Sequence, residues 1–175
     1  KMLHDYLLSK GIKSILTREV GGTAEAEKIR NLLVHCELFP ISELMLVMSA
    51  RYEHINKVII PALLEGVWVI CDRFVDSTAC YQSRDNGLSL EDIYELHEKL
   101  MTMNNDNIAR MEVSRGASLS KNLLCLNHKR GIMPDLTFFM DIDPKIGLDR
   151  ASERGQVNKF EEKNIEFHKK VYEMG

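Results

Sequence analysis

Residues 67–73 read VWVICDR, and this stretch sets the expected fold. Its apolar part is nearly continuous rather than alternating, which is typical of a parallel strand covered by helices on both faces. Two further runs have the same character: Ser14–Leu16, which leads to Thr17, and Leu136–Met140, which leads to Asp141. Helical patterns lie between the runs. We therefore expect an α/β protein with a parallel sheet flanked by helices.

Apolar residues at helical spacing predict helices around and between these strands. The expected helices are Met2–Leu8, Glu25–His35, Ser42–Leu64, Leu90–Met103, Pro144–Arg154 and Glu161–Met174. Ser42 and Ser89 are expected N-caps, and Pro61 is expected to kink or end its helix. The polar stretch Asn104–Lys121 is weakly periodic, so we interpret it as a mobile surface excursion.

Composition narrows the class of protein. The chain has 175 residues, of which 45% are hydrophobic and 28% charged, so one domain with a real core is expected. A net charge of -3 argues against a dedicated nucleic-acid binder. No apolar run approaches the length of about 18 residues that spans a bilayer, so no membrane partner is expected. Four cysteines without a C-x-x-C favour reduced thiols and a cytoplasmic location.

Charged residues follow each expected strand, where ligands bind in parallel α/β sheets. Arg18-Glu19 is followed by Gly21-Gly22, and the glycines would let backbone approach a ligand. A simple turn with a solvated ion pair is the alternative. Asp72 would hold Mg²⁺ through water and Arg73 would clamp a phosphate, unless the two form a structural pair.

The basic side chain of Arg51 and a basic run near the C-terminus each have a structural and a functional interpretation. Arg51 lies on a mostly apolar helix and needs a carboxylate or a ligand as partner, and a salt bridge is favoured. Arg150, Arg154 and Lys159 would form a solvated face. Near a phosphate-transfer site they would instead belong to a mobile lid.

Taken together, these segments resemble bacterial thymidylate kinase (dTMP kinase), a family of P-loop nucleoside monophosphate kinases. The resemblance rests on motifs in matching order: Thr17–Gly22 for T-R-E-P-G-G, Glu27–Arg30 for G/A-E-x-[IL]-R, Ser49–Arg51 for the helix signature, Asp72–Gln82 for D-R-x-x-x-S-x-x-A-Y-Q, Pro134–Thr137 for P-D-L-T, and Arg154–Glu161 for the lid. It implies a three-layer, P-loop kinase-like α/β fold in one kinase domain over residues 1–175, with a lid at about 150–161.

The resemblance also implies a role for each matching residue. Arg73 would grip the dTMP phosphate near Arg18 and Glu19, and Asp72 would organise Mg²⁺. Arg51 and Gln82 would read the thymine edge. The thymidylate pocket would further contain Arg30, Val47, Ser77, Thr78 and Tyr81. Arg150, Arg154 and Lys159 would cover ATP, with Arg154 acting in catalysis beside Asp72 and Arg73. A homodimer is also implied.

The chain departs from the family pattern at several positions. Val20 replaces the motif proline, Val47 the phenylalanine that stacks on thymine, Ser83 a glycine, and Asn158-Lys159 the lid's Asp-Arg. The sequence contains no G-x-x-x-x-G-K-[ST], the loop that cradles ATP phosphates. We therefore expect a truncated chain, lacking the P-loop unit before Lys1 and a strand–helix unit after Gly175, that does not bind ATP normally as it stands.

The leading hypothesis is ATP-dependent phosphorylation of dTMP to dTDP, for dTTP synthesis. Phosphoryl transfer requires positioning and cations more than a nucleophilic side chain. Two alternatives stay open: another nucleoside or deoxynucleoside monophosphate kinase, which Val47 leaves room for, and a non-catalytic nucleotide-binding protein without a P-loop.

Overall fold

Two parallel strands form the sheet of this protein. The structure, a computed structural model, describes residues 1–83, 87–102, 132–153, 155 and 159–173. Strand β1 (Ser14–Arg18) pairs with β2 (Trp68–Asp72) in parallel, from Ser14 opposite Trp68 to Arg18 opposite Asp72. Two of the three expected strands are thus confirmed. The register brings both carboxyl ends, with their charged residues, to one edge of the sheet.

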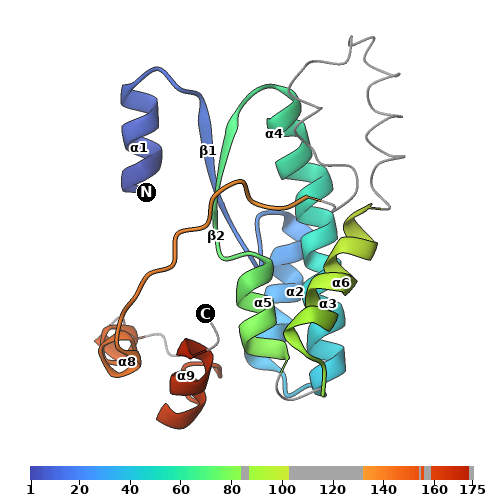
Figure 1. Cartoon of the computed structure of the whole chain (residues 1–175), viewed down its shortest axis with the longest axis vertical. Coiled ribbons are helices and arrows are strands. Elements are labelled where there is room, and N and C mark those ends of the chain that lie inside the picture. Colours follow the sequence, from blue (N-terminus) through green and yellow to red (C-terminus); the bar gives the residue numbers. More distant parts are fainter. Residues whose placement is uncertain (84–86, 103–131, 154, 156–158, 174–175) are drawn as a thin grey trace.

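A series of helices connects the two strands. The connection consists of α2 (Ala24–His35), α3 (Pro40–His54), the π-helix η1 (Ile55–Ile59) and α4 (Ile60–Leu64). Figure 1 shows α1 (Met2–Ser9) on one side of the strands and α2 to α6 on the other. Helix α1 packs against β1, and α4 packs against β2.

The expected helix Ser42–Leu64 is present, but it differs at its start and near Pro61. It begins at Pro40 with Phe39 as the N-cap residue, so the prediction of Ser42 as N-cap is wrong. Proline fits the first turn because its missing N–H has no intrahelical acceptor there. The π-helical turn at Ile55–Ile59 directly precedes Pro61, where the helical hydrogen-bond pattern must adapt to a residue without an N–H.

Helices α5 (Val75–Gln82) and α6 (Leu90–Thr102) pack together beside α3. Ser89 caps α6 as expected: its Oγ accepts from the Asp92 amide at 3.1 Å, and the Ser89 amide donates to Asp92 Oδ2 at 2.8 Å. Apolar side chains from these helices and the π-helical turn form two core clusters: Ile55, Ile59, Ile60, Phe74, Val75, Met101 and Ile132 in one, and Leu44, Met48, Ala79 and Ile93 in the other.

The prediction of a third strand at Leu136–Met140 is wrong. The segment is irregular, and its side chains are exposed, Leu136 by 70% and Met140 by 80%. An extended segment becomes a strand only when a neighbour pairs with its amides and carbonyls. Among the described residues the sheet has only β1 and β2, and they pair with each other.

Two short helices complete the described part of the chain. Helix α8 (Pro144–Glu153) matches its expected range over the described residues, and α9 (Ile165–Tyr172) begins at the side-chain cap Asn164 rather than at Glu161. The excursion Asn104–Lys121 lies outside the described residues. No helix in the described part is long and apolar enough to cross a membrane.

A buried histidine links α6 to the segment that follows the excursion. His97 is fully buried, and its Nε2 lies 2.9 Å from the carbonyl oxygen of Ile132, so Nε2 carries the proton. Its Nδ1 is buried and has no hydrogen-bond partner in the described structure. Burial lowers the pKa of His97 to about 4, the opposing Ile132 hydrogen bond being the weaker effect.

The low pKa of His97 predicts acid-sensitive folding. The unfolded chain binds a proton at this residue near pH 6.5 and the folded chain only near pH 4, so the contribution of His97 to stability is complete above 6.5 and lost as pH falls toward 4. Within that window the free energy of unfolding should fall by about 1.4 kcal/mol per pH unit because of this group.

Urea unfolding at several pH values measures this slope. His97→Gln should flatten it, the exposed control His35→Gln should not, and equal slopes in both variants would contradict the assignment.

Candidate active site

A buried ion pair lies at the carboxyl edge of the sheet. Arg51 on α3 is 2% exposed, and its Nε donates to Oε2 of Glu19 at 2.6 Å. Glu19 follows β1 and is 5% exposed. Arg51 Nη2 also donates to Thr78 Oγ1 on α5 at 2.6 Å. The salt bridge favoured for Arg51 from the sequence is therefore confirmed, and it ties β1, α3 and α5 together.

His54 extends this network on the same face of α3. Its Nδ1 lies 3.1 Å from Glu19 Oε1, and its Nε2 lies 2.6 Å from Thr17 Oγ1. The turn after β1 packs closely on the ring: a Cβ on Gly22 would lie 2.5 Å from His54 Cδ2, and Gly22 has a φ of +84°. Glycine is required here for both space and backbone conformation.

The other charged residues of the first turn form exposed contacts. Arg18 Nη2 donates to both carboxylate oxygens of Glu27, at 3.1 and 2.9 Å. Burial opposes ionisation of Glu27, but the Gly22 amide and the Arg18 guanidinium outweigh it and lower the pKa of Glu27. Arg30 Nη1 donates to the Val20 carbonyl at 3.1 Å. Arg18 therefore has a solvated ion-pair partner in Glu27, whereas Glu19, the acidic residue next to it in the sequence, is buried and paired with Arg51.

Asp72 and Arg73 are exposed at the end of β2. Arg73 has a φ of +67°, a left-handed conformation that is unfavourable for a residue with a side chain. Its guanidinium carbon lies 5.4 Å from the centre of the Tyr81 ring on α5. Helix α5 begins two residues after Arg73, so the positive end of this helix adds to the guanidinium charge. This corner of the protein is suited to an anion.

Five of the residues expected to contact thymidylate lie on α3 and α5, which pack against each other. Val47, Thr78 and Gln82 are buried, whereas Ser77 and Tyr81 are partly exposed. The structure thus brings Arg51 together with Thr78, and Arg73 together with Tyr81. The partly buried thiol of Cys71 precedes this site, and burial raises its pKa to about 12, with the Glu19 charge adding to the effect. That thiol stays protonated.

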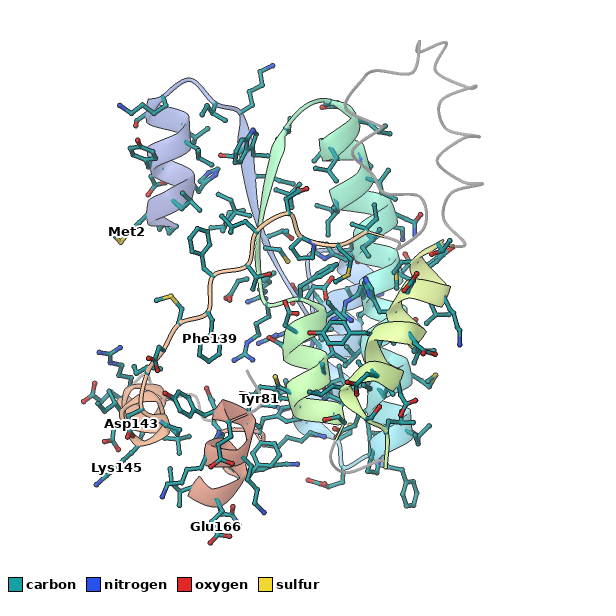
Figure 2. All side chains as sticks on the ribbon, viewed as in Figure 1. Met2, Tyr81, Phe139, Asp143, Lys145 and Glu166 are labelled. Atoms are coloured by element: carbon teal, nitrogen blue, oxygen red, sulfur yellow. The ribbon has the colours of Figure 1, made fainter. Side chains whose placement is uncertain are left out.

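The expected lid contacts the site through Phe160, whereas Lys159 contacts α3 and the end of α2. Lys159 Nζ donates to the Cys36 carbonyl at 2.9 Å and forms an ion pair with Glu43 on α3. Tyr81 makes edge contacts with Phe160 and Phe167, at 6.1 and 6.0 Å between ring centres. Figure 2 shows Tyr81 on α5 at the side toward α9. Arg150 is exposed on α8, and Arg154 and Asn158 lie outside the described residues.

Sequence reasoning did not select His54 or Phe167. His54 was one of six scattered histidines without metal-ligand spacing. Its only local signal was its position three residues after Arg51, which places both on one helix face. Phe167 carried no signal, because its partner Tyr81 lies far away along the chain.

The described residues offer limited means of holding a metal. No group of three or more His, Cys, Asp or Glu residues is arranged to hold one within the described ranges. Asp72 is a single exposed carboxylate beside Arg73. That is compatible with Mg²⁺, which commonly takes one or two protein carboxylates, phosphate oxygens and waters.

The fold and site together define an α/β protein with an anion-binding corner at the carboxyl edge of a parallel sheet. The family model "Thymidylate kinase" matches residues 1–109 and 112–174. The thymidylate kinases of Rickettsia typhi and Rickettsia africae are each 45% identical over 174 residues, which cover 98% of this chain and 71% of theirs. That of Rickettsia bellii is 43% identical over 173 residues, covering 99% and 70%. The chain belongs to the thymidylate kinase family.

Two arginine–glutamate pairs provide a matched comparison of stability. Arg51→Ala would leave the buried carboxylate of Glu19 without its main cation, so we expect a loss of about 3 kcal/mol in the free energy of unfolding. Arg18→Ala removes a pair whose side chains are 53% and 41% exposed, so its loss should stay below about 1 kcal/mol. Urea denaturation of both variants measures the difference. Equal losses would show that the buried pair does not stabilise the fold as described.

Proposed function

We propose that this protein phosphorylates dTMP to dTDP with ATP as phosphoryl donor. The family membership supports the reaction, and the observation that carries the site is Arg73, exposed at the end of β2 beside Tyr81 and the start of α5. Phosphoryl transfer depends on positioning and charge stabilisation, which cations at a strand edge supply.

In this proposal the dTMP phosphate binds Arg73, and the base lies between α3 and α5. A guanidinium has five N–H donors. Arg51 uses Nε for Glu19, Nη2 for Thr78 and Nη1 for a contact of 3.7 Å with Met48 Sδ. Donors therefore remain on both terminal nitrogens for a thymine carbonyl. Gln82 offers its amide to the rest of the base edge.

The remaining predicted substrate residues fall into two groups. Val47, Ser77, Thr78 and Tyr81 line the space for base and sugar on α3 and α5. Glu19 acts through Arg51, because both of its oxygens are already engaged. Arg18 and Arg30 keep the turn after β1 in place through Glu27 and Val20, and Arg18 stays exposed enough to meet a bound phosphate.

The residues expected to serve ATP are only partly in place. Lys159 is engaged by Glu43 and Cys36, so its ammonium group does not face a phosphate in this arrangement. Arg150 is exposed and Arg154 is outside the described residues. Asp72 suits Mg²⁺, which would neutralise charge on the transferred phosphate. We propose that Arg150, Arg154 and Lys159 belong to the lid over ATP and that Arg154 also acts in catalysis.

Several further features belong to the same proposal. The protein would have a three-layer, P-loop kinase-like fold in a single domain, with residues at about 150–161 as lid, and would act in the cytoplasm on small nucleotides. It would be a homodimer: exposed apolar side chains at the start of α3, Phe39, Ile41 and Met45, offer a surface for a second copy.

Val47 favours a broader choice of monophosphate substrates as the alternative function. A buried valine contacts a base by its methyl groups and does not stack on it as an aromatic ring does. Selectivity for thymine over other pyrimidines would then depend on Arg51 and Gln82. A broader deoxynucleoside monophosphate kinase is the second candidate.

A coupled assay of the full-length protein with ATP, Mg²⁺ and a panel of acceptors distinguishes these candidates. We expect turnover with dTMP, weaker turnover with dUMP and dCMP, and none with thymidine, because thymidine lacks the phosphate that Arg73 binds. Phosphorylation of thymidine but not of dTMP would overturn the proposed function. Equal rates with all three monophosphates would favour the broader kinase.

Substitutions at Arg73 separate its charge from its backbone conformation. Arg73→Ala and Arg73→Gly should both abolish measurable dTMP phosphorylation, because both remove the phosphate-binding cation. The free energy of unfolding should be about 1 kcal/mol larger for Arg73→Gly than for Arg73→Ala, since glycine accepts a φ of +67° without strain. Thermal unfolding and kinetics measure the two effects. Near-normal kcat/KM in either variant would show that Arg73 does not bind the phosphate.

A further inference from the structure

A continuous hydrogen-bonded chain runs behind the proposed base-binding residue. Thr17, His54, Glu19, Arg51 and Thr78 are joined in that order by contacts between 2.6 and 3.1 Å. Four of these residues, His54, Glu19, Arg51 and Thr78, are at most 5% exposed. In the proposed function Arg51 offers its remaining N–H donors to the base, and His54 is two links away from it.

The partners of His54 determine which nitrogen carries its proton. Glu19 is a carboxylate that already accepts from Arg51, so His54 Nδ1–H donates to its second oxygen. Nε2 lies 2.6 Å from the Thr17 hydroxyl oxygen, within hydrogen-bond distance. The ring thus fixes the rotation of the carboxylate group that holds Arg51.

The surrounding structure leaves the ring no room to turn. Gly22 approaches Cδ2 and Nε2 so closely that a Cβ there would lie 2.5 and 2.6 Å away. Thr17 is on β1 and Gly22 in the turn that follows, so the strand end and the turn both hold the histidine. Without His54, the buried Oε1 of Glu19 would lose its hydrogen bond to the ring, and the carboxylate would be free to rotate away from Arg51.

We propose that His54 is a positioning residue for nucleotide recognition: through Glu19 it aims the guanidinium of Arg51 at the base of the bound monophosphate. This inference rests on the proposed function, because it takes the base to lie at Arg51. It adds a residue that touches no substrate and acts through another. Its effect should appear in monophosphate affinity and base discrimination and leave the interaction with ATP unchanged.

Two isosteric substitutions separate the two hydrogen bonds of His54. Asparagine can present an amide N–H where His54 has Nδ1, whereas glutamine reaches the position of Nε2. His54→Asn should therefore keep the bond to Glu19 and bind dTMP within about threefold of the wild type, and His54→Gln should bind about tenfold more weakly. Isothermal titration calorimetry with dTMP and dCMP, without ATP, measures affinity and base discrimination. His35→Asn, on an exposed histidine at the end of α2, is the control.

The outcomes distinguish the inference from the function on which it rests. Failure of the wild type to bind dTMP would overturn the proposed function, and the inference with it. Wild-type binding with equal affinities for His54→Asn and His54→Gln would overturn the inference alone. Should either variant fail to fold, Thr17→Val and Thr17→Ser decide: loss of the hydroxyl in Thr17→Val should weaken dTMP binding by about threefold, and Thr17→Ser should restore it. Equal binding by these two variants would contradict the role of the ring.

Discussion

The buried pair between Glu19 and Arg51 is the interaction on which the site depends. It joins the end of β1 to the last turn of α3, and Thr78 extends the contact to α5. Two opposite charges in a region this buried are costly to desolvate, so each needs every hydrogen bond that the surroundings can supply. His54 and Thr78 supply them. Once the pair forms, the relative positions of β1, α3 and α5 are fixed, and so is the space between the two helices.

This arrangement divides the arginines of the protein into two functions. Arg51 is buried and oriented by its neighbours, which suits recognition of a flat base by directional hydrogen bonds. Arg73 is exposed in a left-handed conformation at the end of β2, where charge and access matter more than fixed geometry. A nucleoside monophosphate has both kinds of group, an uncharged base edge and a dianionic phosphate. The thymidylate kinase family, to which this chain belongs, is consistent with that division.

The sequence predicted most of what depends on local pattern. The apolar runs before Arg18 and Asp72 predicted β1 and β2. The helical spacing of apolar residues predicted α2, α6 and α8. Leu136–Met140 failed because strand formation depends on a partner that the segment's own composition does not reveal. Ser42 failed as a cap because Pro40, two residues earlier, is an equally good start. In the site, Arg51 was correctly expected to have a carboxylate partner. That the partner is Glu19, itself held by His54, depends on tertiary contacts between residues more than thirty positions apart.

A crystal structure of the protein with dTMP would show whether the base meets Arg51 while the phosphate meets Arg73. We expect the phosphate within hydrogen-bond distance of the Arg73 guanidinium and a thymine carbonyl on a terminal nitrogen of Arg51. The Glu19–Arg51 and Glu19–His54 bonds should be retained. A nucleotide bound elsewhere, or an Arg51 released from Glu19 when the base binds, would contradict it.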